Sequence, residues 1–216
     1  MDEEILYNKA IKAAKNVEPL KSAEVVMNKM WLYLKLLKNK GLKGDVLEIG
    51  SRKGKTTVFL SIIMGELFPD NIITSVDPYT MDGAKKSLKG EADKIDEIYQ
   101  TFCHHTKHLM NHRHIKDSSE CIPIELDHNL IFTFIDGEHS LLAVWRDFEN
   151  AYHMSAPGGI IAIDDYQNGA WPGVVKAYKE ILNAYGEDQL ISVIGKTPKT
   201  VFLRVNKIGE ENESTN

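Results

Sequence analysis

The sequence predicts an α/β fold: a sheet of seven mostly parallel strands, with helices on both faces and an antiparallel hairpin at its end. Two observations support this fold. Short apolar runs alternate with longer helix-like segments between residues 46 and 185, as strands and crossover helices do. Two further apolar runs, 190–194 and 200–205, are joined by the short turn GKTPK, which predicts an antiparallel pair.

The elements are expected in the following order. Two helices come first, at about 4–16 and 20–39, and the second repeats apolar residues every three or four positions, which gives one buried face. The strands that follow are expected at 46–49, 72–76, 114–115, 130–135 and 160–163, and the helices between and after them at 55–68, 83–110, 141–154 and 174–185.

Composition limits the classes of function. Of 216 residues, 43% are hydrophobic and 26% charged, which is typical of a globular protein. A net charge of -5 provides no basic field for nucleic acid, so no nucleic-acid partner is expected. No apolar run has membrane-spanning length, and the acidic start does not resemble a signal peptide. Two cysteines are too few for a disulfide framework, which favours a cytoplasmic protein with free thiols and no membrane partner.

In parallel sheets of this kind, ligands bind beyond the carboxyl ends of the strands. The first strand ends in VLEIGSRKGKTT, residues 46–57, where Gly50 and Gly54 allow a sharp turn and a close approach to a ligand. The dinucleotide pattern G-x-G-x-x-G is absent, and Glu48 would tolerate a ligand ammonium better than a pyrophosphate. The second strand ends at Asp77, an acid that can accept both hydroxyls of a ribose, although Asp-Pro also opens turns.

These residues resemble class I S-adenosylmethionine-dependent methyltransferases. VLEIGSRKGKTT is similar to the first motif of the catechol O-methyltransferase type, V-L-E-L-G-x-x-x-G-x-[ST]. Asp77 matches the ribose-holding acid, SAPGG at 155–159 is similar to the Pro-Gly-Gly turn before the fifth strand, and the closing hairpin also resembles the family. The resemblance spans about residues 44–205. It implies a Rossmann-like S-adenosylmethionine-binding domain at 41–206, preceded by a helical extension at 1–40 and followed by a disordered tail at 207–216.

The resemblance also implies which residues contact the cofactor. The loop after the first strand would face the methionine part, and Ser118 and Ser119, in KDSSECIP, match the adenine-side loop. From the residues alone, that serine pair could equally cap a helix. The expected cofactor-binding residues are Glu48, Gly50, Ser51, Gly54, Thr56, Asp77, Ser118, Ser119 and Asp136.

Three carboxylates lie at the ends of the expected fourth and fifth strands. In FTFIDGEHS, Asp136 directly follows the apolar run, and in GGIIAIDDY, Asp164 and Asp165 do. Neighbouring parallel strands would bring these acids together, and such a cluster is satisfied by a hard divalent cation, Mg²⁺ first. The catechol-type enzymes, which this pattern resembles, have an Asp-Asn pair at the second place, so Asp165 adds a charge. The alternative is a metal-independent methyltransferase in which Asp136 contacts the cofactor.

His139 lies three residues after Asp136, where the catechol-type family has a lysine base. A histidine can take a proton from a hydroxyl near neutral pH. The D-G-x-H pattern resembles antibiotic-pathway and sugar O-methyltransferases more closely. His139 and Asp136 are therefore the expected catalytic residues; alternatively, His139 orients a loop or ligates the metal.

The sequence thus predicts an S-adenosylmethionine-dependent O-methyltransferase, assisted by a divalent metal, that acts on a hydroxyl of a sugar or natural product. The N-terminal helices are expected to cover the pocket or to form a homodimer face. Two alternatives stay open: a nicotinamide-dependent oxidoreductase on a similar sheet, and a cofactor-binding module without chemistry.

Overall fold

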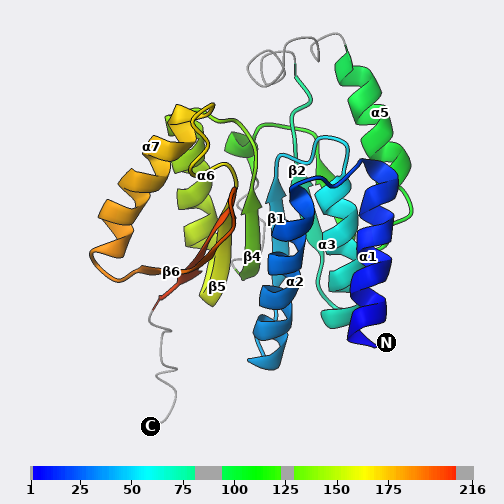
Figure 1. Ribbon diagram of the computed structural model, residues 1–216, viewed down its shortest axis with the longest axis horizontal. Helices are drawn as coiled ribbons and strands as arrows, with labels where there is room; N and C mark the ends of the chain where they lie inside the picture. The colour runs from blue at the N-terminus through cyan, green and yellow to red at the C-terminus, as the bar shows by residue number, and fades with distance from the viewer. Residues whose placement is uncertain (1, 81–93, 123–128, 208–216) are drawn as a thin grey trace.

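A computed structural model, which describes residues 2–80, 94–122 and 129–207, confirms the α/β fold. These residues contain one seven-stranded sheet in the order β3-β2-β1-β4-β5-β7-β6 (Figure 1). The pairs from β3 to β5 are parallel, and β7 runs antiparallel to both β5 and β6. The strands are β1 (Asp45–Ile49), β2 (Ile73–Val76), β3 (His112–Ile115), β4 (Leu130–Ile135), β5 (Ser155–Ile163), β6 (Ile191–Lys196) and β7 (Val201–Val205).

Helices cover both faces of the sheet, because side chains of a strand alternate between its two faces. In β5, Ile160 and Ala162 belong to the core under α1, α2 and α3, whereas Ile161 and Ile163 belong to the core under α6 and α7. Figure 1 shows these two helical layers on opposite sides of the sheet. The helices are α1 (Glu3–Val17), α2 (Ala23–Asn39), α3 (Lys55–Leu67), α5 (Ile95–Thr106), α6 (Leu141–Met154) and α7 (Pro172–Ile181), with a 3-10 turn η2 (Ser119–Cys121) and a π-helical turn η3 (Leu182–Gly186).

The N-terminal helices belong to the same core as the sheet. Asp2 caps α1 by accepting from the backbone N–H groups of Glu4 and Ile5. Leu6 of α1 and Leu34 of α2 are at most 2% exposed and share the core of α3. The helices are therefore packed on the domain. The division near residues 40 and 206 stays a prediction.

The structure corrects one expected helix. The sequence predicted a helix mostly over 83–110, but α5 ends at Thr106, and residues 81–93 lie outside the described residues. His112 belongs to β3, where its Nε2 lies 2.7 Å from the Ser75 hydroxyl. His104 on α5 and His112 on β3 therefore lie on different elements. The tail expected to be disordered begins at residue 207, which is described, but 208–216 are not, and neither are 123–128.

No described helix is both long enough and apolar enough to cross a lipid bilayer. The two cysteines are free thiols, with Cys103 half-buried and Cys121 exposed.

Candidate active site

The loop after β1 lies directly against the end of β4. Gly50 has a φ of 90°, and a Cβ added there would lie 2.0 Å from the Asp136 carbonyl oxygen. Only glycine tolerates both the left-handed backbone and this contact. The backbone N–H of Asp136 donates to the Ile49 carbonyl at 2.8 Å, which continues the β1–β4 pairing to the edge of the sheet. The glycine loop and Asp136, which the sequence predicted as parts of the site, are therefore adjacent.

Glu48 lies beneath this loop. Its side chain is 0% exposed, and the Thr57 hydroxyl at the start of α3 donates to one of its carboxylate oxygens. The other oxygen has no hydrogen-bond partner within the described residues. Burial raises the pKa of Glu48 to about 8, because an isolated charge is costly away from water. At pH 7 the Glu48 carboxyl group is therefore neutral, and it holds the start of α3 through Thr57.

Asp77, the expected ribose ligand, is held by backbone amides. Its Oδ2 accepts from the N–H of Arg52 at 2.8 Å, and its Oδ1 accepts from the N–H of Tyr79 at 3.0 Å. The Tyr79 hydroxyl donates to the Arg52 carbonyl at 2.6 Å and lies 3.1 Å from the Ser51 hydroxyl. Each carboxylate oxygen has a second lone pair for a ligand hydroxyl. Asp77 thus connects the end of β2 to the loop after β1.

Two expected cofactor residues fall at η2. The Ser118 hydroxyl accepts from the backbone N–H of Glu120 at 3.3 Å, so it caps the turn. Ser119 bonds to the buried carboxylate of Asp147 on α6. The capping interpretation is therefore present in the structure, and the contact with adenine stays a prediction.

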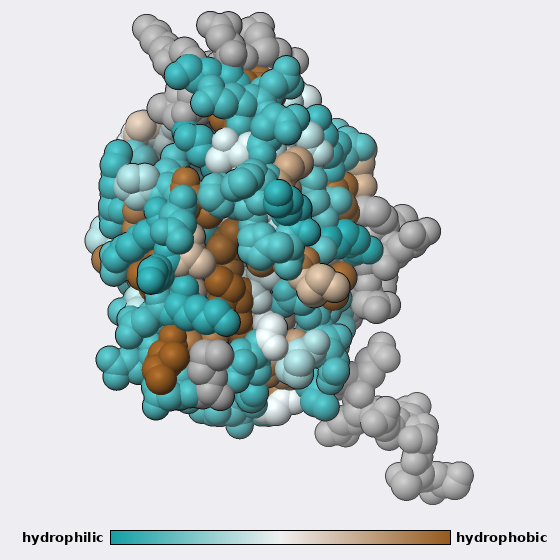
Figure 2. Space-filling model, turned by 90° about the vertical axis from the view of Figure 1, so that its right-hand side faces the viewer, coloured by the Kyte–Doolittle hydropathy of each residue, from teal (hydrophilic) through white to brown (hydrophobic). Residues whose placement is uncertain are grey.

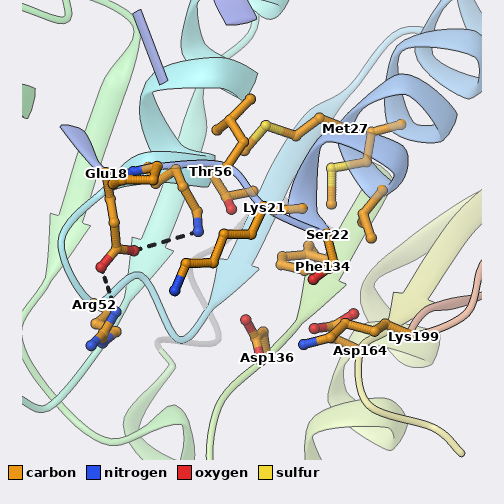
Figure 3. Close-up of a pocket in the computed structure, with 16 residues that line it drawn as sticks. Glu18, Lys21, Ser22, Met27, Arg52, Thr56, Phe134, Asp136, Asp164 and Lys199 are labelled. Carbon is orange, nitrogen blue, oxygen red and sulfur yellow. Dashed lines mark hydrogen bonds and ion pairs between the residues drawn. The ribbon is translucent and has the colours of Figure 1, made fainter. Parts of the chain in front are cut away.

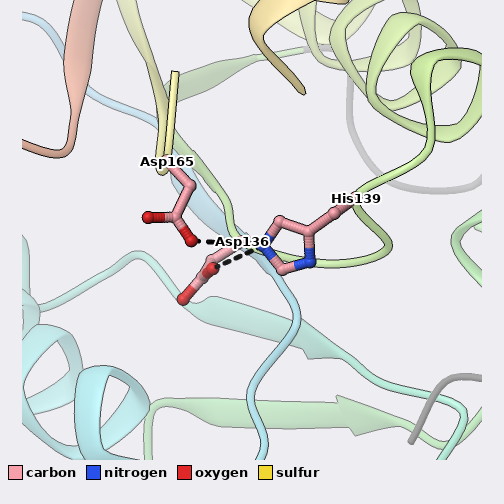
Figure 4. A group of neighbouring side chains, drawn as sticks. All are labelled: Asp136, His139 and Asp165. Atoms are coloured by element: carbon pink, nitrogen blue, oxygen red, sulfur yellow. Dashed lines mark ion pairs between the residues drawn. The ribbon is translucent and has the colours of Figure 1, made fainter. Parts of the chain in front are cut away.

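The acids at the ends of β4 and β5 form one cluster (Figure 4). Ligand atoms of Asp136, His139 and Asp165 all lie within 4.8 Å of one another. His139 Nε2 is 3.4 Å from Asp165 Oδ2 and 3.9 Å from Asp136 Oδ1. Asp165 has a φ of 53°, so it bends out of the strand at this position. The cluster offers two carboxylates and an imidazole to a cation.

Asp164 faces the pocket rather than the imidazole. The Thr200 hydroxyl at the start of β7 donates to its Oδ1. Figure 3 shows Asp164 beside Asp136, with both carboxylates directed into the same pocket. All three expected metal ligands therefore lie at one edge of the sheet. Asp136 shares the pocket with Asp164 and shares the cluster around His139 with Asp165.

Desolvation and charge repulsion together determine the electrostatics of this cluster. The Asp136 side chain is 38% exposed, but it opens onto a pocket whose walls exclude much of the bulk water. This desolvation and the nearby carboxylates of Asp164 and Asp165 raise the pKa of Asp136 well above its usual value. Desolvation also raises the pKa of Asp164. Protons or an external cation can relieve this strain.

Asp165 differs from its two neighbours. Burial would raise its pKa, but hydrogen bonds from His139 and Asn168 and the nearby ammonium of Lys199 lower it below the usual value. Lys199 Nζ lies 3.8 Å from Asp165 Oδ1, and Asn168 Nδ2 donates to the same oxygen at 3.0 Å. Asp165 is therefore ionised and already partly neutralised by the protein.

The His139 ring is fixed by its neighbours. It stacks on the Trp171 ring with centroids 4.2 Å apart and an interplanar angle of 18°. Gly173, in the first turn of α7, lies so close to this loop that a Cβ would be 2.4 Å from the His139 carbonyl oxygen. Trp171 therefore supports the imidazole.

A pocket of about 450 Å³ joins the glycine loop to the acids (Figure 3). Thr56 and Arg52 line it on the loop side, and Asp136 and Asp164 line it on the acid side. Its roof is the turn between α1 and α2 and the first half of α2. The volume is typical of a small-molecule site. The expected covering of the pocket by the N-terminal helices is thus present.

Three charged residues of this pocket were missed in the sequence. Glu18 follows α1, Lys21 lies in the next turn, and Lys199 lies in the β6–β7 turn. Each is distant in sequence from the strand ends, so no local motif indicates it. The sequence predicted a hairpin turn at GKTPK. The position of Lys199 in this turn was the only signal that a lysine could reach the acids.

The comparisons with known proteins identify the family. The sequence profile of the methyltransferase-domain family, Methyltransf_24, matches residues 47–166. The chain belongs to this family. The match covers the glycine loop, Asp77 and all three acids, and it confirms the resemblance to class I S-adenosylmethionine-dependent methyltransferases.

Individual relatives are more distant. The chain is 31% identical over 137 residues to an uncharacterized protein, R132, of Acanthamoeba polyphaga mimivirus. The match covers 63% of this chain but only 58% of the viral protein. Among solved structures, the O-methyltransferase NovP superposes with a TM-score of 0.75 at 14% identity, over 95% of this chain and 100% of NovP. An O-methyltransferase from Bacillus cereus in complex with SAH has a TM-score of 0.59 at 17% identity, over 94% and 90%. These structural similarities confirm the fold.

Proposed function

We propose that the protein is an S-adenosylmethionine-dependent O-methyltransferase that acts on a hydroxyl of a small molecule, a sugar or a natural product. One observation carries the proposal: the glycine loop of a methyltransferase-family domain lies against Asp136, so a donor bound at this loop would lie beside the acid cluster. The SAH-bound relative supports the donor. The D-G-x-H pattern, with His139 directed at the acids, supports the hydroxyl acceptor.

The residues of this chain divide the work as follows. Asp77 holds the ribose of the donor, and the glycine loop faces its methionine part. The acceptor oxygen must lie in line with the sulfonium methyl group, about 3 Å away, for direct transfer. In the tautomer that leaves Nε2 unprotonated, His139 takes the hydroxyl proton at Nε2, and Asp165 Oδ2, 3.4 Å from that nitrogen, stabilises the imidazolium that forms. Trp171 keeps the ring in this orientation.

A divalent cation fits the acid cluster. Desolvation and mutual repulsion raise the pKa of Asp136 and Asp164, so these carboxylates lack the positive charge that would stabilise them as anions. Oxygen-rich sites suit Mg²⁺, and an imidazole beside two carboxylates also suits Mn²⁺. Asp136 with Asp164, or Asp136 with Asp165 and His139, would hold the ion. The ion would supply positive charge beside the acceptor oxygen.

A metal-independent methyltransferase is the second candidate. Lys199 and His139 already neutralise Asp165, and protonation can relieve Asp136 and Asp164. In this case, Asp136 would contact the donor, and His139 alone would handle the acceptor proton.

Calorimetry tests the proposal. S-adenosylhomocysteine should bind the purified chain, and NAD⁺ should not bind. Binding of NAD⁺ without binding of S-adenosylhomocysteine would refute the methyltransferase. A methylation assay in excess EDTA, followed by readdition of Mg²⁺ or Mn²⁺, separates the two candidates: full activity in EDTA selects the metal-independent enzyme.

We further propose a homodimer through the N-terminal helices. Val25, Leu32 and Leu36 of α2 are 54%, 50% and 43% exposed, and Ile5 of α1 is 61% exposed. Figure 2 shows hydrophobic side chains interrupting the mostly hydrophilic surface on the side of the molecule where α1 lies. Light scattering of the wild-type chain and of Leu32→Lys tests it; a monomeric wild type refutes the dimer.

A further inference from the structure

Two lysines of the pocket come from turns outside the strand ends. Lys21 enters it from the α1–α2 turn, and Lys199, which also pairs with Asp165 at 3.8 Å, enters from the β6–β7 turn. Figure 3 shows the two side chains on either side of Asp136, with Asp164 beside Lys199. The two lysines come from opposite ends of the chain and converge on the space above the acids.

Other basic residues of the pocket are already paired. Glu18 binds Arg52 Nη1 at 2.9 Å, Lys55 Nζ at 3.4 Å and Lys53 Nζ at 3.6 Å. The pKa of Glu18 would rise through its partial burial, but these three cations lower it, so Glu18 is a stable anion at the side of the glycine loop. These residues connect the N-terminal turn to the loop after β1.

Lys21 has no such partner. It makes no ion pair with another described residue, and its backbone has a φ of 47°, a conformation that costs a non-glycine residue about 1 kcal/mol or more. Its neighbour Leu20 is 4% exposed and anchors the turn, and the Leu20 carbonyl accepts from the N–H of Ala23 at 2.8 Å. A buried anchor thus holds a lysine at the pocket in a conformation that glycine would adopt more easily.

The charges of the loaded pocket require an anion. Four basic side chains (Lys21, Arg52, Lys55 and Lys199) and three acidic ones (Glu18, Asp136 and Asp164) line it. Asp165, which pairs with Lys199, is a fourth acid at this cluster, so the charges of the side chains alone balance. S-adenosylmethionine adds a sulfonium and an ammonium against one carboxylate, and a divalent cation at the acids would add two more positive charges. A neutral acceptor, even with one deprotonated hydroxyl, would leave an excess of positive charge in the loaded pocket, and such an excess favours an anionic ligand.

We propose that the acceptor carries a carboxylate or phosphate group, which binds between Lys21 and Lys199 while the acceptor hydroxyl lies at the acid cluster. This inference rests on the proposed methyltransferase function and narrows its substrate class to anionic hydroxyl compounds, such as sugar acids or sugar phosphates. The other source of a carboxylate in this pocket is the methionine part of the donor, and the experiment separates the two.

The test uses inorganic phosphate as the probe and the full chain saturated with S-adenosylmethionine and Mg²⁺, without an acceptor; a parallel titration with S-adenosylhomocysteine in excess EDTA shows how much of the binding depends on the sulfonium and the metal. Phosphate-31 NMR titration should show saturable binding. Because each charge-assisted hydrogen bond contributes about tenfold to affinity, Lys21→Met and Lys199→Met should each weaken binding by about that factor. Lys21→Arg and Lys199→Arg should restore it. Methionine keeps the length and the backbone strain at residue 21 and removes only the charge.

Lys176→Met is the matched control. Lys176 lies on α7 with a 68% exposed side chain, pairs with Glu180 at 3.8 Å and does not line the pocket. Its substitution should leave phosphate binding unchanged. No saturable binding to the wild type, or wild-type affinity in both pocket variants, overturns the inference.

The affinity for S-adenosylhomocysteine distinguishes the remaining outcomes. If Lys21→Met leaves this affinity unchanged, the site belongs to the acceptor. If phosphate binds the free chain but is displaced by S-adenosylhomocysteine, and Lys21→Met weakens the latter, Lys21 binds the donor carboxylate and the inference is wrong. If S-adenosylhomocysteine does not bind the wild type, the proposed function fails too; if it binds and phosphate does not, only this inference fails.

Discussion

The two halves of the active-site edge treat their acids differently. At the ends of β1 and β2, burial raises the pKa of both acids, but the protein supplies hydrogen bonds to each: Asp77 accepts two backbone N–H groups, and one oxygen of Glu48 accepts from the Thr57 hydroxyl. At the ends of β4 and β5, Asp136 and Asp164 line the same pocket, and desolvation and neighbouring carboxylates raise their pKa values.

This difference indicates which half of the site needs positive charge from a ligand. The donor half is preorganised, because its hydrogen bonds fix the glycine loop before any ligand arrives. The acid half is incomplete, because a carboxylate cluster is stable as an anion only with added positive charge. Substitutions in the donor half should therefore change cofactor affinity, and those in the acid half should change metal binding and turnover.

The largest effect is expected for His139→Ala. Loss of a general base lowers turnover by about 100-fold to 10,000-fold. The affinity for S-adenosylhomocysteine should not change, because His139 contacts Asp165 and Trp171 on the acid side. Measurement of kcat with an acceptor that the wild type methylates, together with calorimetry, checks both expectations.

Trp171→Phe is the matched variant for this prediction. A phenyl ring keeps part of the stack on His139, so turnover should fall much less than in His139→Ala. A loss of cofactor affinity in His139→Ala, with kcat retained, would make His139 a binding residue. A loss of Mn²⁺ affinity would make it a metal ligand.

The next effect is expected for Asp136→Asn. Asp136 belongs to both acid pairs, so its loss should lower Mn²⁺ affinity by about 100-fold or more. Electron paramagnetic resonance of free Mn²⁺, titrated with S-adenosylhomocysteine-bound protein, measures the change. Asp188→Asn, at an exposed position after η3, is the control. Equal Mn²⁺ affinity in both variants, or no binding to the wild type, favours the metal-independent candidate.

The same division separates what the sequence predicted well from what it missed. The fold class, a mostly parallel sheet that ends in an antiparallel hairpin, follows from local signals, because alternating apolar runs and helices permit few topologies. The acids at 136, 164 and 165 were predictable because each directly ends an apolar strand, and such ends meet at one edge. The helix over 83–110 was wrong at its end: α5 ends at Thr106, because the chain must turn before His112 to pair β3 with β2.

The charged roof of the pocket could not be read from the sequence for the same reason. Glu18 and Lys21 lie in a turn with no strand-end context, and the partners of Glu18, Arg52 and Lys55, are 34 and 37 residues away in the chain. Lys199 reaches Asp165 only because β7 pairs with β5. Local patterns position residues along a strand, whereas contacts of turns depend on packing between elements.

Asp77→Ala tests the donor half. Removal of the carboxylate deletes the proposed bonds to the ribose and frees the N–H groups of Arg52 and Tyr79, so S-adenosylhomocysteine should bind about 10-fold to 100-fold more weakly. Mn²⁺ binding at the acids should persist. Calorimetry with S-adenosylhomocysteine and its 2′-deoxy analogue sharpens the result: the variant should bind both equally, and the wild type should prefer the ribose form. No preference in the wild type would remove the ribose assignment.

The smallest effect is a pH-dependent one beneath the acid half. Asp147 on α6 is 1% exposed, and its Oδ1 has no hydrogen-bond partner within the described residues. Burial raises its pKa to about 6, although a hydrogen bond from Ser119 and the charge of Arg146 oppose the rise. The folded state therefore binds this proton more tightly than the unfolded state. The free energy of unfolding falls as pH rises from about 4 to about 6 and stays lower above that range.

Asp147→Asn removes the titrating group and should flatten this dependence. The difference in free energy of unfolding, variant minus wild type, should be about 1 kcal/mol larger at pH 8 than at pH 5. The reason is that the wild type loses stability above pH 5 as this one buried carboxyl group ionises. Urea unfolding at the two pH values measures the difference, and Asp188→Asn should show none. An equal stability change at both pH values would mean that Asp147 is already ionised at pH 5, because Ser119 and Arg146 would then compensate its burial.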